Sequence, residues 1–211
     1  MRVISGSLKG RKINFLKNYT TRPLKDSVRE SIFNVLEHSK FFKVKIKNSN
    51  ILDLYSGIGS FGIESLSRGA AKITFIEQDK KAVEILERNL MVLSVYDRVK
   101  LINNKIEIEL EKKFIEKFSI FFFDPPFIDN NFIDNLKTIK IKKIYKKEHL
   151  IIIHRERQTE DNLDDLIKIV DTKIYGRSKI IFGTFNWVIF LLKFLLVQQQ
   201  VDYRDLSLTD C

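Results

Sequence analysis

Short apolar runs alternate with amphipathic runs along most of this chain, and no other feature of the sequence limits the fold as strongly. We expect strands at 50–56, 72–77, 98–103, 119–124, 149–154, 170–176 and 179–185. Helical spacing is expected at 60–69, at 79–93, between the fourth and fifth strands, and at 160–170. The pattern predicts an α/β fold: a doubly wound, mostly parallel, seven-stranded Rossmann-like sheet covered on both faces.

Positive charge is concentrated near the N-terminus. Residues 1–47 hold 12 Lys and Arg against 3 Asp and Glu, so they carry a net +9 of the whole-chain +10. Charge confined to one segment indicates a polyanionic partner, because neutralising phosphates releases counterions and gives affinity for nucleic acid. We expect a basic N-terminal extension at 1–47 for nucleic acid, one α/β domain at 48–185, and a tail at 186–211 without an assigned role.

The sequence shows no pattern for a disulfide, a zinc site, a signal peptide or a membrane span. Cys211 is the only cysteine, so no intrachain disulfide can form, and no Cys/His cluster has zinc spacing. The first residues are polar and basic with no apolar run behind them, which predicts no signal peptide. The apolar run at 187–197 is too short for a membrane span, which needs about 20 residues. We expect a cytoplasmic, monomeric protein with no metal site.

The segment DLYSGIGSFG at 53–62 connects the first strand to a helix. Gly57 and Gly59 belong to a G-x-G-x-x-G pattern, and Glu77 ends the next strand about 20 residues later, where it would hold ribose hydroxyls. This spacing indicates a cofactor that contains adenosine. Asp53 argues against a pyrophosphate, since a carboxylate would repel phosphates. The cationic amino acid group of S-adenosylmethionine would be attracted instead.

The fourth expected strand ends in FFFDPPF at 121–127. Two prolines cannot continue a strand, because neither has an N–H for the ladder. Asp124 should lie beside the glycine turn, since parallel strands present their carboxyl ends at one edge. The stiff turn would aim the Asp124 carboxylate and nearby carbonyls at the N–H bonds of a base amino group, while Phe127 stacks on that base. This predicts methylation of an exocyclic amino nitrogen without a metal or a covalent intermediate.

Five stretches resemble the RsmD-type 16S ribosomal RNA guanine-N2 methyltransferases, which are class I enzymes dependent on S-adenosylmethionine. These stretches are ISGSLKGRKI (4–13), TRPLKDSVRESIFNVL (21–36), ILDLYSGIGSFGIESLSRGA (51–70), FIEQD (75–79) and FFFDPPF (121–127). The resemblance implies that Asp53, Gly57, Gly59 and Glu77 bind S-adenosylmethionine. It also implies that Asp124, Pro125, Pro126 and Phe127 hold the target guanine of 16S rRNA, either naked or in a small-subunit particle.

The two N-terminal stretches also predict an RNA-contacting surface. Ser27 and Glu30 form a capping-box pattern ahead of an apolar helical face. The cations of these stretches would then remain near RNA phosphates. The predicted RNA-binding residues are Arg11, Lys12, Arg22, Lys25 and Arg29.

Two stretches depart from the family pattern. The family carries an acidic residue after the third strand, near the adenine, whereas this chain has Asn103 and Asn104 there. Asn104 is therefore the predicted adenine contact. Family members finish near the strand at 179–185, whereas this chain continues to residue 211. His154, after the fifth strand, is predicted to be structural.

Other functions remain open from the sequence. An adenine-N6 methyltransferase acting on DNA or RNA uses the same proline turn, although this chain has no obvious target-recognition domain. A nicotinamide-dependent dehydrogenase would explain the glycines but would leave Asp53 and Asp124 unexplained. A non-catalytic RNA-binding protein would not need the full set of site residues. Methylation of guanine N2 in 16S rRNA is the leading prediction.

Overall fold

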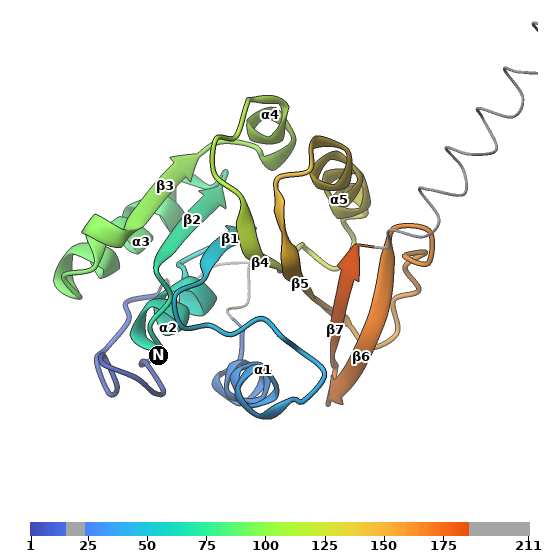
Figure 1. Ribbon diagram of the computed structural model, residues 1–211. Coiled ribbons are helices and arrows are strands. Elements are labelled where there is room, and N and C mark those ends of the chain that lie inside the picture. The colour runs from blue at the N-terminus through green and yellow to red at the C-terminus, as the bar shows by residue number, and fades with distance from the viewer. Residues whose placement is uncertain (16–23, 186–211) are drawn as a thin grey trace, which may run out of the picture.

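The computed structural model describes residues 1–15 and 24–185, and a seven-stranded sheet forms its centre (Figure 1). The strands are β1 (Asn50–Leu54), β2 (Lys72–Glu77), β3 (Val99–Asn103), β4 (Phe118–Phe123), β5 (Tyr145–Glu156), β6 (Ile167–Tyr175) and β7 (Ser178–Phe185). Their order is β3-β2-β1-β4-β5-β7-β6. The first five strands run parallel, and β7 and β6 form an antiparallel edge. The predicted α/β, mostly parallel seven-stranded sheet is confirmed.

Helices cover both faces of the sheet (Figure 1). They are α1 (Asp26–His38), α2 (Ser60–Ser67), α3 (Lys80–Val92), α4 (Ile106–Glu111) and α5 (Asn131–Lys142), with a 3-10 turn at Tyr96–Arg98. Alternate strand residues face opposite layers, so Phe122 packs with α1, α2 and α3, whereas Phe121 and Phe123 pack with α4 and α5. Within the described residues, no helix combines the length and apolar character that crossing a bilayer requires. The predicted tail at 186–211 lies outside the described residues.

The end of α2 follows from its glycine. Gly69 has φ +91°, a conformation that favours glycine. The Ala70 amide donates to the Ser65 carbonyl at 3.0 Å, and the Gly69 amide donates to the Leu66 carbonyl at 3.1 Å. This is a Schellman motif, which satisfies carbonyls at the helix end and turns the chain toward β2.

The predicted helix at 160–170 is wrong. The amides of Leu166 and Ile167 donate to the Leu163 carbonyl, which closes a single turn. The backbone then enters β6 at Ile167 and pairs with β7. Leu163 and Ile167 are buried beneath the sheet edge, so their helical spacing reflects this one turn and the packing after it. Pairing with β7 supplies the backbone hydrogen bonds that a helix would otherwise provide.

The N-terminal segment packs against α2 and α3. Glu64, buried in α2, accepts hydrogen bonds from the amides of Ile4 and Ser5 at 2.7 and 2.9 Å. Asn14 and Asn89 exchange two hydrogen bonds of 2.8 and 3.1 Å. These contacts fasten the segment to the helices that follow the glycine turn and β2. The division of the chain at residue 47 stays a prediction.

The predicted capping box at the start of α1 is wrong. The helix begins at Asp26 with Lys25 in the capping position, and no side chain caps it. Ser27 therefore lies inside the first turn, and its backbone carbonyl accepts from the Ser31 hydroxyl at 2.8 Å. Glu30 is exposed on the same helix.

His149 connects β5 to the end of β7 through a hydrogen bond that should make the stability of the fold depend on pH. Its Nε2 accepts from the Phe185 amide at 2.9 Å, which requires an unprotonated Nε2, and burial lowers the pKa of His149. A depressed folded-state pKa stabilises the fold above the unfolded value of about 6.5, and this contribution is lost as pH falls through the folded pKa. We expect the free energy of unfolding to decrease below about pH 6.5, and His149→Gln to reduce that decrease. Urea unfolding of both proteins across pH measures this; identical pH profiles would exclude His149 as the source.

Candidate active site

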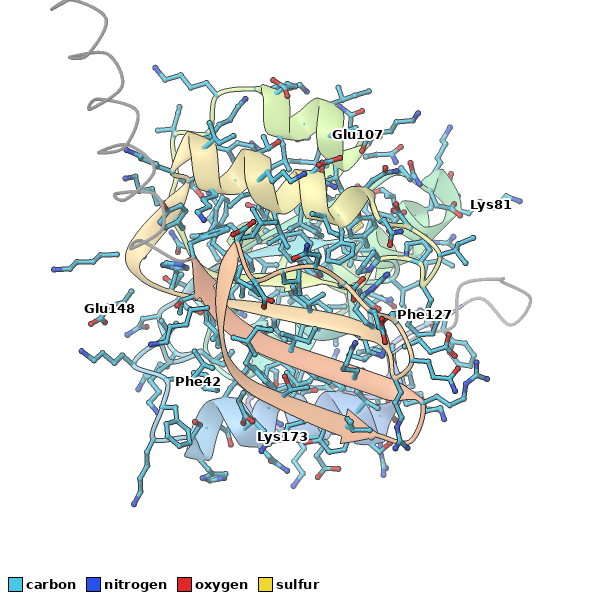
Figure 2. All side chains as sticks on the ribbon, turned by 90° about the vertical axis from the view of Figure 1, so that its right-hand side faces the viewer. Phe42, Lys81, Glu107, Phe127, Glu148 and Lys173 are labelled. Carbon is cyan, nitrogen blue, oxygen red and sulfur yellow. The ribbon has the colours of Figure 1, made fainter. Side chains whose placement is uncertain are left out.

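The glycine turn and the proline turn meet at the carboxyl edge of the sheet. β1 and β4 are neighbours, and the Asp124 amide donates to the Leu54 carbonyl at 3.4 Å. Figure 2 shows Phe127 and Lys81 toward one end of the strands and Glu148 toward the other. The strand order reverses direction between β1 and β4, which is where open α/β sheets bind ligands. The structure thus brings Asp124 beside the glycine turn, as the sequence predicts.

The glycine turn is packed on one side and open on the other. Gly57 and Gly59 have φ +53° and +80°. A Cβ on Gly59 would meet Leu86 Cδ1 at 2.3 Å, so the buried Leu86 side chain would have to shift, and the positive φ also disfavours a larger residue. Apart from Gly57 and its two chain neighbours, no atom of the described residues lies within 4 Å of the position that a Cβ on Gly57 would take. The backbone at Gly57 is therefore accessible to a ligand that approaches closely.

Asp53 is a buried carboxylate that is only half satisfied. Its Oδ2 accepts from the Gly62 amide at 3.0 Å, while Oδ1 has no hydrogen-bond partner among the described residues. Burial raises the pKa of Asp53 well above its usual range. A buried acceptor without a donor is costly, and a nearby cationic donor would offset that cost. The residue fits the ammonium group of S-adenosylmethionine better than a phosphate.

Glu77 joins the glycine turn to the end of β2. Its Oε2 accepts from the Gly57 amide at 2.7 Å, and its Oε1 accepts from the Asp79 amide at 2.8 Å. Each carboxylate oxygen has a second lone pair, so Glu77 can also accept ribose hydroxyls. Asn104 lies beside the end of β2, because its backbone N–H donates to the backbone carbonyl of Glu77 at 3.1 Å. The Asn104 side chain donates to Glu109 at 3.3 Å, which orients it from α4.

His154 lies against the proline turn. Its Nδ1 is 2.7 Å from Asp124 Oδ1, and its Nε2 is 2.9 Å from the Ser178 hydroxyl. The rings of His154 and Phe127 meet edge to face with centroids 5.7 Å apart. Phe127 is 38% exposed, so part of its ring is available to a partner. Sequence analysis predicted Asp124 and Phe127 at this site, but it did not predict that either residue contacts His154.

Arg155 holds the backbone of the proline turn, and sequence reasoning missed it. The side chain is buried and forms an ion pair with Asp161 at 3.0 Å. It also donates to the carbonyls of Pro126, Phe127 and Asp129 and to the side chain of Asn130. No described residue donates to the Pro125 carbonyl, so this oxygen and Asp124 Oδ2 remain as acceptors. An arginine directly after the apolar run LIIIH was the available signal.

Tyr55 ties the glycine turn to α5. It has φ +59°, an uncommon conformation for a residue with a side chain. Its hydroxyl accepts from Asn135 Nδ2 at 3.0 Å. Burial, followed by the nearby charge of Asp129, raises the pKa of Tyr55. The strained backbone is thus held by a bond to the helix that follows the proline turn.

The predicted RNA-binding residues differ in their surroundings. Lys12 and Lys25 are exposed, and Arg11 is exposed although its guanidinium donates to the Val92 carbonyl at 2.9 Å. Arg29 is fully buried, donating to the Arg2 carbonyl at 2.6 Å and pairing with Asp26 at 3.1 Å. The prediction for Arg29 is corrected, because a buried guanidinium cannot reach a phosphate. Arg22 lies outside the described residues.

Comparison with known proteins gives consistent matches. The family model described as conserved hypothetical protein 95 matches residues 1–184. Ribosomal RNA small subunit methyltransferase D of Buchnera aphidicola subsp. Acyrthosiphon pisum is 36% identical over 156 residues, covering 74% of this chain and 78% of the relative. Putative rRNA methyltransferase YlbH of Bacillus subtilis is 33% identical over 171 residues, covering 79% and 90%. The solved structure of putative methyltransferase yhhF from Escherichia coli has a TM-score of 0.75 at 26% identity, covering 88% and 98%.

Proposed function

This chain belongs to the RsmD-type methyltransferase family, and we propose that it methylates the exocyclic N2 amino group of a guanine in 16S ribosomal RNA, using S-adenosylmethionine. The observation that carries the proposal is the meeting of Asp124, on its proline turn, with the open glycine turn at one sheet edge. Relatives whose names state small-subunit ribosomal RNA support the substrate class. The modification would belong to maturation of the small ribosomal subunit in the cytoplasm.

One group of residues in this chain would bind the cofactor, and another would bind the target base. Asp53 would accept from the ammonium group of S-adenosylmethionine, and Glu77 would accept from its ribose hydroxyls. Gly57 would let the cofactor approach the backbone closely. When bound, S-adenosylmethionine supplies the methyl group: the nitrogen lone pair forms the C–N bond, the C–S electron pair stays on sulfur, and one N–H proton leaves to solvent.

The proline turn would act on the amino group itself. Asp124 Oδ2 and the Pro125 carbonyl, which accept no hydrogen bond from the described residues, would accept its two N–H bonds. Acceptors fixed before the reaction favour the positive charge that develops on nitrogen during attack. Phe127, whose ring is partly exposed, would stack on a base turned out of its helix. These steps require no metal ligand and no covalent intermediate from the protein.

Labelled S-adenosylmethionine tests the proposal directly. The purified protein would be incubated with 16S rRNA and with small subunits, both from a strain that lacks the gene, followed by nucleoside analysis. Label in N2-methylguanosine supports the proposal. Label in N6-methyladenosine would instead support the adenine-N6 alternative, which the same proline turn could serve. Absence of transfer to either substrate would contradict methyltransferase activity on this RNA.

Cofactor choice gives a separate prediction. We expect the protein to bind S-adenosylmethionine and not NAD, because the unpartnered Oδ1 of Asp53 can accept from an ammonium group, whose charge would favour the ionised carboxylate, whereas a pyrophosphate would disfavour it. Asp53→Ala should weaken binding of S-adenosylmethionine by about tenfold or more, since a bond to a charged group is lost. Calorimetric titration with both ligands measures this. Tight NAD binding without S-adenosylmethionine binding would overturn the cofactor assignment.

RNA binding through the N-terminal segment gives another prediction. Lys12→Ala/Lys25→Ala should weaken RNA binding and reduce the slope of log K against log salt by about 0.7 to 0.9 for each lost phosphate contact. Affinity for S-adenosylmethionine should not change, because neither lysine contacts the glycine turn. The matched control is Lys113→Ala/Lys117→Ala, which removes equal charge from the loop at the amino end of β4. Equal slopes for the two variants would place the RNA elsewhere.

A further inference from the structure

His154 touches two parts of the proposed target site at once. Its Nδ1 is 2.7 Å from Asp124 Oδ1, and its ring packs edge to face with Phe127. The residue is 7% exposed, so water competes little for these contacts. It stands in β5, where pairing with β4 and β7 on either side fixes the backbone. A rigid side chain thus contacts both the carboxylate and the aromatic ring proposed to act on the base.

The hydrogen bonds determine which ring nitrogen acts on Asp124. An ionised carboxylate only accepts, so Nδ1 carries the hydrogen. Nε2 is 2.9 Å from the Ser178 hydroxyl, which can donate to a neutral ring or accept from a charged one. The Nδ1–H bond to Asp124 is therefore compatible with both protonation states of His154.

We propose that His154 is a positioning residue for methyl transfer, an inference that rests on the proposed function. Its Nδ1–H holds Asp124 Oδ1, which leaves Oδ2 directed to the target amino group. Its ring also packs edge to face with Phe127, so the stacking ring and the acceptor keep one relative geometry. Misplacing a reacting group slows a reaction even where binding is intact. The contribution of His154 should therefore lie in the rate of transfer and not in affinity.

Substitution of His154 by asparagine or by glutamine distinguishes the role of Nδ1 from that of Nε2. Asparagine can place its nitrogen where Nδ1 stands, whereas glutamine reaches toward the position of Nε2 and loses the bond to Asp124. We expect His154→Gln to lower the single-turnover rate by about 10- to 100-fold. His154→Asn should be faster than His154→Gln but slower than wild type, since it restores a donor to Asp124 without the ring that contacts Phe127. Affinities for S-adenosylmethionine and RNA should be unchanged in both variants.

The outcomes distinguish this inference from the proposed function. Folded Asn and Gln variants that both transfer methyl groups at the wild-type rate would overturn the positioning role alone. Absence of transfer by the wild type would overturn the proposed function and this inference with it. If His154→Gln does not fold, Ser178→Ala and Ser178→Thr replace it, because only threonine keeps the hydroxyl beside Nε2. A slower Ala than Thr variant supports the role of His154, and equal rates overturn it.

Discussion

Replacing Asp124 by alanine should lower the rate of methyl transfer by about 100-fold or more, because a fixed acceptor is lost where charge develops. Affinity for S-adenosylmethionine should remain close to that of the wild type. Asp53 and Glu77 make their hydrogen bonds within the glycine turn and the end of β2, without Asp124. Single-turnover transfer and calorimetry measure the two quantities separately.

Two comparisons interpret the result for Asp124. Asp124→Asn keeps one acceptor oxygen and should lose less activity than the alanine variant. Asp134→Ala is the matched control, because this exposed carboxylate on α5 pairs only with Lys137 in the described contacts, at 2.7 Å. Wild-type transfer by Asp124→Ala would show that Asp124 only shapes the turn, and the mechanism would be wrong.

Replacing Arg155 by methionine should reduce the free energy of unfolding by about 3 to 5 kcal/mol, since it breaks a buried ion pair. The side chains of Arg155 and Asp161 are 1% and 2% exposed, so Asp161 would keep a buried charge without its partner. Three carbonyls of the proline turn would lose the donor that Arg155 supplies, and of these the Pro126 carbonyl would still accept from the Asp129 amide at 2.9 Å. Methyl transfer should therefore fall even at temperatures where the variant stays folded. Urea unfolding and single-turnover transfer measure the two effects.

An arginine close in sequence supplies the control for Arg155. Arg177 pairs with Glu156 at 2.5 Å, but its side chain is 80% exposed. Exposed pairs contribute little, so Arg177→Met should cost less than about 1 kcal/mol. Similar losses for the two variants would mean that the burial of Arg155 and its contacts with the proline turn do not set its contribution.

The sequence located the two turns of the site because both depend on local chemistry. Gly57 and Gly59 mark a strand-to-helix turn that needs positive φ, and Pro125 and Pro126 must end a strand. Parallel strands present their carboxyl ends at one edge, so these turns had to share that edge once the alternation was recognised. The same local reasoning failed at 160–170, where helical spacing over one turn was followed by strand pairing with β7.

The burial of individual charged side chains and their contacts with distant residues could not be predicted from the sequence. Arg29 looked like a phosphate contact, but the structure buries it against the carbonyl of Arg2. His154 was predicted to be structural, but its hydrogen bonds to Asp124 and Ser178, across 30 and 24 residues of chain, could not be read from the sequence.

The sequence by itself determined the fold class, the glycine turn and the proline turn, because periodicity and backbone restriction act between near neighbours in the chain. Only the tertiary structure decided that β7 lies beside β5. That strand order in turn decides which side chains contact the glycine turn and the proline turn. Arg155 and His154 are adjacent in β5, yet one holds the carbonyls after Pro125 while the other holds Asp124. Such contacts depend on strand order and packing, which no local pattern specifies.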